Sequence, residues 1–298
     1  MHVCFVFSNR SEYSELKPFI DFFKKKAKVD VIDLSKKIKK LEFDKNLHKI
    51  FTYCYEIFSK KKFDYVLILG DRKELPFIAL PAFFLDIKII HLAAGEYIES
   101  ITNYDQFIRP IISILSDYQV CFSKRAKQQV KKLFSSINYL HDNAYFIGNP
   151  VFSDVKIKQL KRYITEDYDL VLLHPQSMSK DDTLSDVKKL KKLLKNKKTI
   201  FISGNRDKNY SIIENFYKKL KSQKNSYSFY KTLPKEKYFS FVKYCDNFFT
   251  NTSSIHEIQF LNKKCLKVIG QRNKGRSNEK FNINAPKELY FIMCRKRM

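Results

Sequence analysis

The chain has 298 residues, 44% of them hydrophobic, and a formal net charge of +26. Its length is sufficient for two ordinary domains with their own cores, and its hydrophobic content excludes an intrinsically disordered protein. The charge allows two interpretations, a polyanionic partner such as nucleic acid or lysines on solvated helix faces. Lysine runs such as SKKIKKLE (35–42) alternate with apolar residues at helical spacing, which favours the second interpretation.

The cysteines have neither the C-x-x-C spacing nor the histidine pairing of a metal site. Most of them lie in apolar runs, which is typical of reduced core residues in a cytoplasmic protein. The apolar region 76–95 contains Asp86 and Lys88, so it predicts a helix followed by a buried strand rather than a membrane span. No signal peptide is evident, because MHVCFVF is followed at once by polar residues. We therefore expect a cytoplasmic protein that needs neither a metal nor a cofactor.

Short apolar runs alternate with helical patterns along the chain, and each run predicts a strand. The runs of the first half are His2–Phe7, Val29–Leu34, Tyr65–Leu69, Lys88–Leu92, Tyr118–Phe122 and Tyr145–Ile147. Those of the second half are Leu170–Leu173, Thr199–Ser203, Ser226–Tyr230, Asn247–Thr250 and Cys265–Ile269, with Leu289–Met293 as a further candidate. Apolar strands between amphipathic helices indicate parallel sheet covered on both faces. The pattern thus predicts two α/β, Rossmann-like domains, 1–150 and 151–298, divided after FIGNP (146–150).

Ligands of open parallel sheets bind beyond the carboxyl ends of the strands. Here nearly every such end carries glycine, hydroxyl groups or charge. In the first half these ends are Ser8-Asn9-Arg10, Gly70-Asp71-Arg72 and AAGE (93–96), followed by NYDQFIR (103–109). In the second half they are His174-Pro175, SGNRD (203–207), TNTSSIHE (250–257) and GQRNKGR (270–276). Two domains of this kind would place both sets of loops on the walls of one cleft.

The ordered series LGDR, IIHLAAGE, NYDQFIR, HP, NTSS and GQRNKGR resembles the UDP-N-acetylglucosamine 2-epimerase family. The resemblance extends from SNR near residue 10 to Arg276, and its G-x-R-x-x-G-R ending indicates the hydrolysing branch, which makes N-acetylmannosamine or related sugars for sialic-acid-type biosynthesis. It implies the GT-B fold, with a UDP-sugar substrate between two Rossmann-like domains, and a homo-oligomer, since relatives commonly dimerise. Family members continue to a final helix that returns to the first domain. We therefore expect a C-terminally short chain whose second domain is incomplete, with one more strand or a short helix in 285–298.

The resemblance also implies a reaction, in which UDP is eliminated to leave a glycal between C1 and C2 and water is then added. Such a route needs carboxylates near the sugar ring and cations on the departing diphosphate. By position, Asp71, Glu96 and Asp105 match the three acids of the family. We expect Glu96 and Asp105 to be the acid–base pair, with Asp71 in support. Arg109 lies one helical turn after Asp105 and could hold a carboxylate or a substrate oxygen, although a surface salt bridge between the two is the alternative.

Substrate-binding residues follow from the same resemblance. Arg10 and Arg72 match nucleotide or sugar contacts of the first domain, where a guanidinium group suits phosphate. An ion pair of Asp71 with Arg72 that faces solvent is the alternative there. His174 matches a contact to the diphosphate, although a histidine after a buried strand is also a common capping or core residue.

The loop NTSSIHE precedes a predicted helix, whose first N–H groups suit phosphate oxygens. Ser253 and Ser254, or Thr252 in a neighbouring register, match the diphosphate contact, and Glu257 matches an acid that binds the ribose hydroxyls. Ser254 and Glu257 can equally form an ordinary capping box. Two further residues match nucleotide-side positions of the family, Asn205 and Arg272.

Three other functions are compatible with parts of the sequence. A GT-B glycosyltransferase would use the same cleft but has no evident use for three acids in the first domain. A UDP-sugar-binding protein without catalysis is suggested by Pro110, which stands where the family usually has histidine. Nucleic-acid binding is supported by the net charge alone, and the spread of the lysines along the chain disfavours it.

Overall fold

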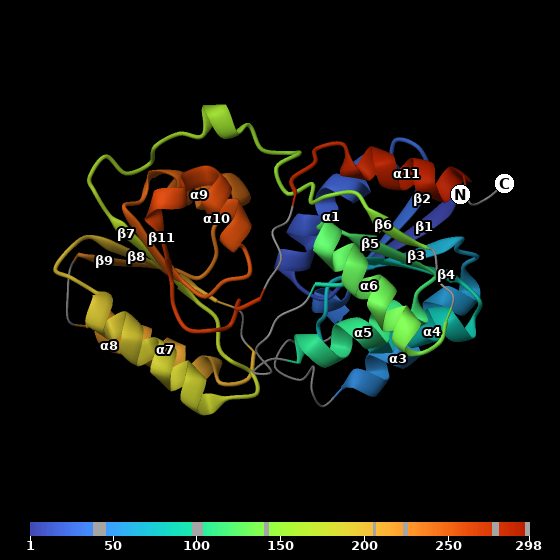
Figure 1. Ribbon diagram of the computed structural model, residues 1–298, viewed down its shortest axis with the longest axis horizontal. Coiled ribbons are helices and arrows are strands. Elements are labelled where there is room, and N and C mark those ends of the chain that lie inside the picture. Colours follow the sequence, from blue (N-terminus) through green and yellow to red (C-terminus); the bar gives the residue numbers. More distant parts are fainter. Residues whose placement is uncertain are drawn as a thin grey trace. The chain divides into compact units, whose positions relative to one another are not determined.

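The computed structural model describes residues 1–37, 46–96, 104–139, 143–204, 207–222, 226–275 and 280–295. These residues form two compact α/β units (Figure 1). The described residues of the first unit lie within Met1–Tyr97, Tyr104–Asp154 and Ser277–Met298, and those of the second unit lie within Val155–Arg276. The division expected from the sequence assigned everything after residue 150 to the second domain, whereas residues 280–295 pack with the first unit.

A six-stranded parallel sheet forms the centre of the first unit, in the order β2-β1-β3-β4-β5-β6. Its strands are β1 (His2–Phe7), β2 (Lys28–Asp33), β3 (Tyr65–Leu69), β4 (Lys88–Leu92), β5 (Tyr118–Cys121) and β6 (Ala144–Phe146). These bounds confirm the six predicted strands to within one residue at each end. All residues of β3 are buried, which explains why that strand is apolar throughout.

Helices cover both faces of this sheet (Figure 1). One face carries α1 (Arg10–Phe23) and α11 (Ala285–Arg295), and the other carries α3 (Leu47–Lys60), α4 (Pro76–Phe84), α5 (Asp105–Leu115) and α6 (Lys124–Ser136). A one-turn helix, α2 (Leu34–Lys37), follows β2. Alternate residues of a strand point to opposite layers, so Val3 and Phe5 of β1 face α1 while Cys4 and Val6 face α3.

The last described segment is a helix, so the strand expected at Leu289–Met293 is wrong. In α11, Ala285, Leu289 and Met293 are spaced four residues apart and therefore share one helix face. That face is buried in the core of the first unit. A short apolar run fits a strand and a buried helix face equally well, and here the four-residue spacing decides.

The second unit is built on a five-stranded parallel sheet in the order β11-β10-β7-β8-β9. Its strands are β7 (Asp169–Leu173), β8 (Thr199–Ser203), β9 (Tyr227–Tyr230), β10 (Asn247–Thr250) and β11 (Leu266–Val268), again within one residue of the predicted runs. One face is covered by α7 (Lys180–Leu193) and α8 (Tyr210–Lys221), and the other by α9 (Lys235–Tyr244) and α10 (Ile255–Asn262). Two 3-10 helices, η2 (Ile157–Gln159) and η3 (Lys263–Cys265), complete the unit.

Each sheet reverses its strand order at one point. In the first unit the reversal lies between β1 and β3, and in the second it lies between β7 and β10. The connections on the two sides of such a point leave in opposite directions, and ligands of doubly wound sheets bind there. The loops after these four strands are therefore the places to look for a site.

Other expectations concern the whole chain. Five of the six cysteines are buried, which confirms that most are core residues, and all six are free thiols. No helix in the described ranges combines the length and apolarity that a membrane span needs. Across the same ranges, no three His, Cys, Asp or Glu side chains gather as metal ligands.

Candidate active site

A buried ion pair between Asp71 and Arg109 lies at the carboxyl end of β3. Gly70 ends the strand with a φ of +89°, a conformation that favours glycine, and the turn presents Asp71. The guanidinium group of Arg109, from α5, donates through one Nη to the Asp71 carboxylate and through the other to the carbonyl oxygen of Ala93. Arg109 therefore ties the loops after β3 and β4 together. Its side chain is only 6% exposed, which excludes the surface salt bridge considered above.

His91, within β4, holds the Gly70 turn in place. Its Nε2 lies 2.7 Å from the Gly70 carbonyl oxygen, and its Nδ1 lies 3.0 Å from Oγ of Ser113. Because a carbonyl oxygen only accepts, Nε2 carries the hydrogen and Nδ1 accepts from the serine hydroxyl. Burial lowers the pKa of His91 to about 4, so the ring is neutral near pH 7. His91 was not among the predicted site residues, although a polar residue inside an apolar strand was an available signal.

Glu96 follows β4 and is held next to the start of α6. A Cβ on Gly95 would overlap the carbonyl oxygen of Ala126, so only glycine permits this close approach. Oγ of Ser123 donates to Oε1 of Glu96 over 3.3 Å and accepts from the Ala126 N–H over 2.9 Å, which also caps α6. The carboxylate thus stands at a helix N-terminus, where the helix dipole favours negative charge.

The other predicted residues of the first unit are placed less completely. Asp105 is the first residue of α5, half-buried and one turn before Arg109. Arg10 is the first residue of α1, and its side chain lies outside the described part of the structure. The structure therefore brings Asp71 and Arg109 together and places Glu96 at the neighbouring strand end.

Arg72 is bound by two buried acids at the strand reversal of the first sheet. Its Nε lies 2.7 Å from Oε1 of Glu74 and 3.7 Å from Oε1 of Glu12. Oγ of Ser8 lies 3.0 Å from Oε2 of Glu12 and 2.6 Å from Oε1 of Glu74, and its single hydrogen can serve only one of them. Burial raises the pKa of Glu12 to about 7, against the opposing effect of Arg72. Neither acid was among the predicted site residues. The guanidinium group pairs with them rather than with Asp71, the partner considered from the sequence.

Asn251 joins the loops at the strand reversal of the second sheet, and its side chain is fully buried. Its Oδ1 accepts from the His174 N–H over 2.7 Å, while its Nδ2 donates to the His174 carbonyl over 2.9 Å and to Oδ2 of Asp186 over 3.1 Å. Burial, together with the charge of Arg272, lowers the pKa of His174 to about 3. The imidazole at this loop is therefore neutral.

The loop after β11 contacts the same residue, Asn251. Arg272 donates through Nη1 to the Asn251 carbonyl over 3.2 Å. Asn273 donates through Nδ2 to the carbonyls of Asn251 and Thr252 over 2.9 and 2.7 Å. A Cβ on Gly270 would overlap the Asp186 carboxylate, so this approach also needs glycine. Asn251 and Asn273 stand in motifs quoted from the sequence, but neither was singled out.

The hydroxyl residues of this loop are ordered by their own backbone. The Thr252 N–H donates to Oγ1 of Thr250 over 3.0 Å, and the Ser254 N–H donates to Oγ1 of Thr252 over 3.4 Å. Ser254 is the N-cap residue of α10, but its side chain makes no capping hydrogen bond, so the capping-box alternative is wrong. Ser253 is half-buried, and Glu257 is buried in the first turn of α10. The remaining predicted residue, Asn205, lies outside the described residues.

Comparison with known proteins identifies the family. The UDP-N-acetylglucosamine 2-epimerase family matches residues 15–290. The chain belongs to this family. It is 29% identical over 250 residues to polysialic acid biosynthesis protein P7 of Escherichia coli, covering 78% of this chain and 61% of the relative. It is 30% identical over 253 residues to GDP/UDP-N,N'-diacetylbacillosamine 2-epimerase (hydrolyzing) of Campylobacter jejuni, covering 80% of this chain and 64% of that relative. The chain thus spans about three fifths of the length of these curated relatives.

Solved structures of epimerases have the same fold. The UDP-GlcNAc 2-epimerase of Methanocaldococcus jannaschii in complex with UDP-GlcNAc and UDP has a TM-score of 0.77 at 16% identity, covering 99% of this chain and all of that chain. The enzyme of Neisseria meningitidis bound to UDP-GlcNAc has a TM-score of 0.74 at 14% identity, with the same coverage. These similarities confirm the predicted fold class, two Rossmann-like α/β units of the GT-B type.

Proposed function

We propose that this family member is a hydrolysing 2-epimerase of a UDP-acetamido sugar. It takes UDP-N-acetylglucosamine or a diacetamido analogue and releases UDP and the free sugar inverted at C2. The observation that carries the proposal is the arrangement of acids at two neighbouring strand ends, where Arg109 fixes Asp71 and Ser123 fixes Glu96. The name of the Campylobacter jejuni relative, which states a hydrolysing 2-epimerase, supports the same reaction.

The first unit handles the sugar in this proposal. The bond between C1 and the diphosphate oxygen breaks, and its electron pair leaves with UDP. Positive charge on the ring then acidifies the C2 proton, which a carboxylate removes to form a C1–C2 double bond. Water adds a hydroxyl group at C1, and a proton returns to C2 from the opposite face. Glu96 and Asp105 exchange these protons, while Asp71, held as an anion by Arg109, stabilises the cationic ring.

The second unit handles the nucleotide. The positive charge of Arg272 and the N–H groups at the start of α10 suit the diphosphate, with the hydroxyls of Thr252, Ser253 and Ser254 beside them. Neutral His174 donates a hydrogen bond without adding charge. Four further residues complete the proposed contacts: Glu257 to the ribose hydroxyls, Asn205 to the nucleotide, and Arg10 and Arg72 to phosphate or sugar.

The direct test is incubation with a panel of UDP- and GDP-acetamido sugars, followed by NMR of the released nucleotide and free sugar. We expect UDP and a 2-epimeric acetamido sugar, with solvent deuterium at C2 when the reaction runs in D2O. Binding of UDP without any turnover would leave only a binding protein, and turnover that requires an added acceptor would indicate a glycosyltransferase. An epimeric product without deuterium at C2 would exclude the elimination route.

Matched variants test the proton-transfer roles of Glu96 and Asp105. Glu96→Gln and Asp105→Asn remove the proton-transfer groups but keep their size, so we expect UDP release to fall by roughly a hundredfold or more while UDP affinity is retained. Glu56→Gln, which changes an exposed acid of α3, is the control and should keep wild-type turnover. Equal turnover in all three variants would contradict the assignment.

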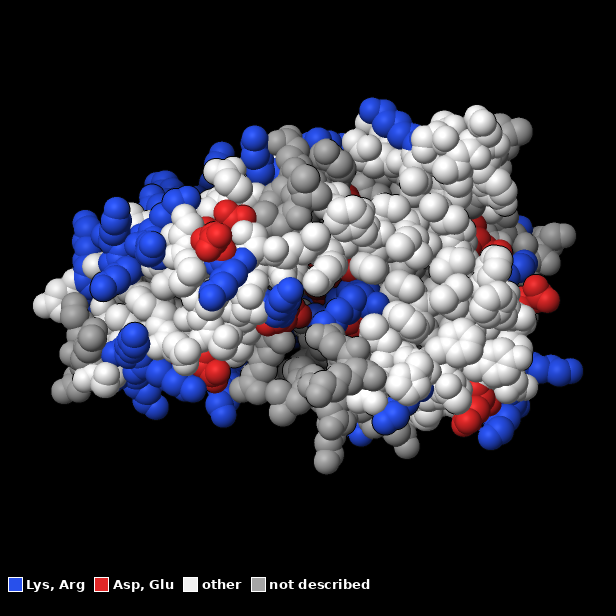
Figure 2. Space-filling model, turned by 90° about the horizontal axis from the view of Figure 1, so that it is seen from below, with Lys and Arg blue, Asp and Glu red and all other residues white. Residues whose placement is uncertain are grey.

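We also propose that the protein is a homo-oligomer that associates through α4 and α5. The exposed large apolar residues of these helices are Phe83, Phe84, Phe107, Ile111 and Ile114. Figure 2 shows few charged side chains over this part of the surface, so two copies that associate here place few like charges against one another at the contact. Light scattering after size exclusion should show a dimer or larger species, and Phe84→Glu with Ile111→Glu should give monomers. Leu193→Glu in α7 is the control, and an unchanged oligomer in the double variant would overturn the interface.

A further inference from the structure

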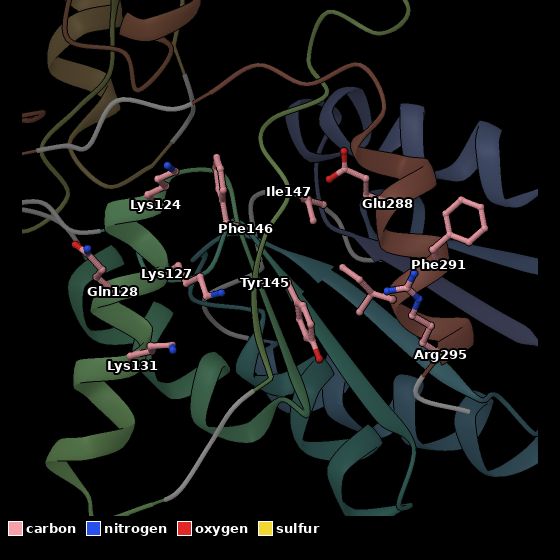
Figure 3. A pocket seen from close by; sticks show the side chains of 11 residues that line it. Lys124, Lys127, Gln128, Lys131, Tyr145, Phe146, Ile147, Glu288, Phe291 and Arg295 are labelled. Carbon is pink, nitrogen blue, oxygen red and sulfur yellow. The ribbon is translucent and has the colours of Figure 1, made fainter. Parts of the chain in front are cut away.

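A basic groove lies along the open edge of the first sheet, between α6 and α11 (Figure 3). We call it the edge groove. Its volume is about 830 Å³. Strand β6 forms its floor, with α6 on one side and α11 on the other. Its lining includes Lys127 and Lys131 of α6, Tyr145 and Phe146 of β6, and Phe291 and Arg295 of α11.

The floor of the edge groove is a strand with one free edge. Among the described strands, β6 pairs only with β5. The Gln119 N–H donates to the Asn143 carbonyl and the Ile147 N–H to the Cys121 carbonyl, so alternate residues of this segment bond toward β5. Ala144 and Phe146 between them direct their backbone groups outward, as alternate residues of a parallel strand do. Such an edge is a template for another strand.

Just beyond β6, the chain's own residues 280–282 occupy the side of this strand that faces β5, because the Lys280 N–H donates to the carbonyl of Phe122 at the end of β5. Asn149 forms a parallel bridge with Phe281. The Asn149 N–H donates to the Lys280 carbonyl over 2.7 Å, and the Asn282 N–H donates to the Asn149 carbonyl over 2.9 Å. This segment therefore lies between the continuations of β5 and β6, and no described strand pairs with the outer edge at Ala144 and Phe146.

The walls of the edge groove carry an excess of positive charge. Its cations are Lys124, Lys127, Lys131 and Arg295, and its one acid is Glu288, which accepts from Nδ2 of Asn282. The lysines recur at intervals of three and four, so they share one face of α6, and Figure 3 shows Lys127 and Lys131 directed toward β6. Within the described part of the chain, no ion pair neutralises these four cations. An acidic occupant would complement this charge.

The two walls differ, and the difference specifies a sequence pattern. Ala144 packs with α6, whereas Tyr145 and Ile147 pack with the core layer that contains α11. A strand added to β6 would likewise point alternate side chains toward the lysines of α6 and toward the apolar side chains Phe291 and Ile292 of α11. We propose that the edge groove binds an extended acidic segment of a partner protein, in which acidic and apolar residues alternate, as an additional strand on β6.

Other occupants fit less well. A second copy of this chain would bring the same lysines face to face, which like-charge repulsion disfavours. Nucleic acid would find cations mainly on one wall, and an apolar wall opposite. Lysines next to an edge strand can also serve only to prevent edge-to-edge aggregation, and in that case no peptide would bind specifically.

The test is fluorescence anisotropy with a labelled peptide of about ten residues in which glutamate and valine alternate. Its controls are an isomer with the same residues in two blocks, an alternating lysine–valine peptide, and single-stranded DNA of equal charge. We expect the alternating acidic peptide to bind at least about tenfold more tightly than each control. Two further peptides carry methyl groups on alternate backbone nitrogens, one at the odd positions and one at the even positions. One of the two should bind about tenfold more weakly, because its methyl groups remove the N–H groups that donate to β6.

Charge reversal in the groove provides the matched variant. Lys127→Glu with Lys131→Glu should weaken the acidic peptide by at least about tenfold and make the lysine–valine peptide the better ligand. Lys191→Glu with Lys192→Glu in α7 changes the net charge equally, and it should alter binding by less than about twofold. An equal loss in both variants, or equal binding of the block isomer or the DNA, would overturn the proposal. UDP release by the groove variant should match wild type, so this result is independent of the catalytic proposal.

Discussion

The two units hold the loops at their strand reversals with different chemistry. In the first unit the loops are joined by charges, with Arg109 on Asp71 and with Arg72 between Glu12 and Glu74. In the second unit they are joined by a neutral amide, Asn251, supported by Asn273. Charged groups can exchange protons and respond to pH, whereas amides do neither. The first unit is therefore suited to proton transfer, whereas the loops of the second present mainly amide, hydroxyl and backbone groups, with the buried acid Asp186 bound by Asn251.

The largest effect is expected from removing the central cation of the first unit. Arg109→Leu leaves the Asp71 carboxylate without its buried partner, which typically costs about 3–5 kcal/mol of unfolding free energy. UDP release should fall by roughly a thousandfold or more, since the loops after β3 and β4 also lose their link. Urea denaturation and NMR of the released UDP measure the two effects.

A double variant separates the two roles of this pair. Arg109→Leu with Asp71→Asn removes the unpaired charge, so most of the stability should return while activity stays low. Arg125→Leu, which removes an exposed arginine of α6, is the control for loss of a cation. Full activity in the double variant would show that the ion pair serves only folding.

The next effect tests whether the charged network responds to pH. The pKa of Glu12 is about 7 in the folded protein, against an ordinary value of 4.5. Below pH 4.5 the carboxyl group is protonated in both states. As pH rises from 4.5 to 7, Glu12 ionises first in the unfolded chain, which then binds fewer protons than the folded protein. The free energy of unfolding therefore falls progressively over this range. Glu12→Gln should therefore raise the free energy of unfolding by up to about 3 kcal/mol at pH 8 and by almost nothing at pH 4.

Chemical denaturation at a series of pH values measures this difference. Glu56→Gln, on an exposed face of α3, should leave the pH dependence unchanged. If Glu12→Gln were destabilising at pH 8, the ionised carboxylate would gain more from Arg72 than it loses through burial, and the raised pKa of Glu12 in the folded protein would be wrong.

The strand ends could be predicted from the sequence because the signals are local. Apolar runs, the glycine after β3 and the polar residues that follow are all read within a few positions. The partners of those residues could not be predicted, because the Asp71–Arg109 pair spans 38 positions of sequence and forms only when two strand-end loops meet. Glu12, Glu74 and Asn251 were missed for the same reason, since each gains its role from a distant loop.

The last helix shows a different limit. The run LYFIM contains β-branched and aromatic residues, which favour a strand, and its length fits a strand as well. Only the four-residue spacing of Ala285, Leu289 and Met293 indicated a helix, and this spacing continues across the proline at position 286. The local pattern was ambiguous, and packing against the first unit decided it.

A smaller effect is expected in the neutral network of the second unit. Asn251→Ala removes three hydrogen bonds and should cost about 2 kcal/mol of unfolding free energy. Because the same change frees the loops after β7 and β10, UDP affinity measured by calorimetry should fall about tenfold. Unlike the Glu12 variant, this loss should not vary between pH 6 and 8.

The control lies in the same unit but away from those loops. Asn262 donates through Nδ2 to the carbonyls of Lys243 and Cys245, so Asn262→Ala should cost a similar free energy. Its UDP affinity should remain near wild type. An equal loss of affinity in both variants would mean that general destabilisation, rather than the Asn251 bridge, controls binding.

The smallest and most selective effect concerns His91, which we infer to be a positioning residue for Asp71. Glutamine at this position keeps a donor near Nε2 for the Gly70 carbonyl, whereas asparagine keeps an acceptor near Nδ1 for Ser113. Both variants should lose about 1 kcal/mol of stability. Only His91→Asn frees the Gly70 turn, so its kcat should fall about tenfold with little change in KM, while His91→Gln stays near wild type. Equal losses of kcat in the two variants would assign His91 to the fold alone, because a purely structural histidine has no reason to depend on which of its two hydrogen bonds is kept.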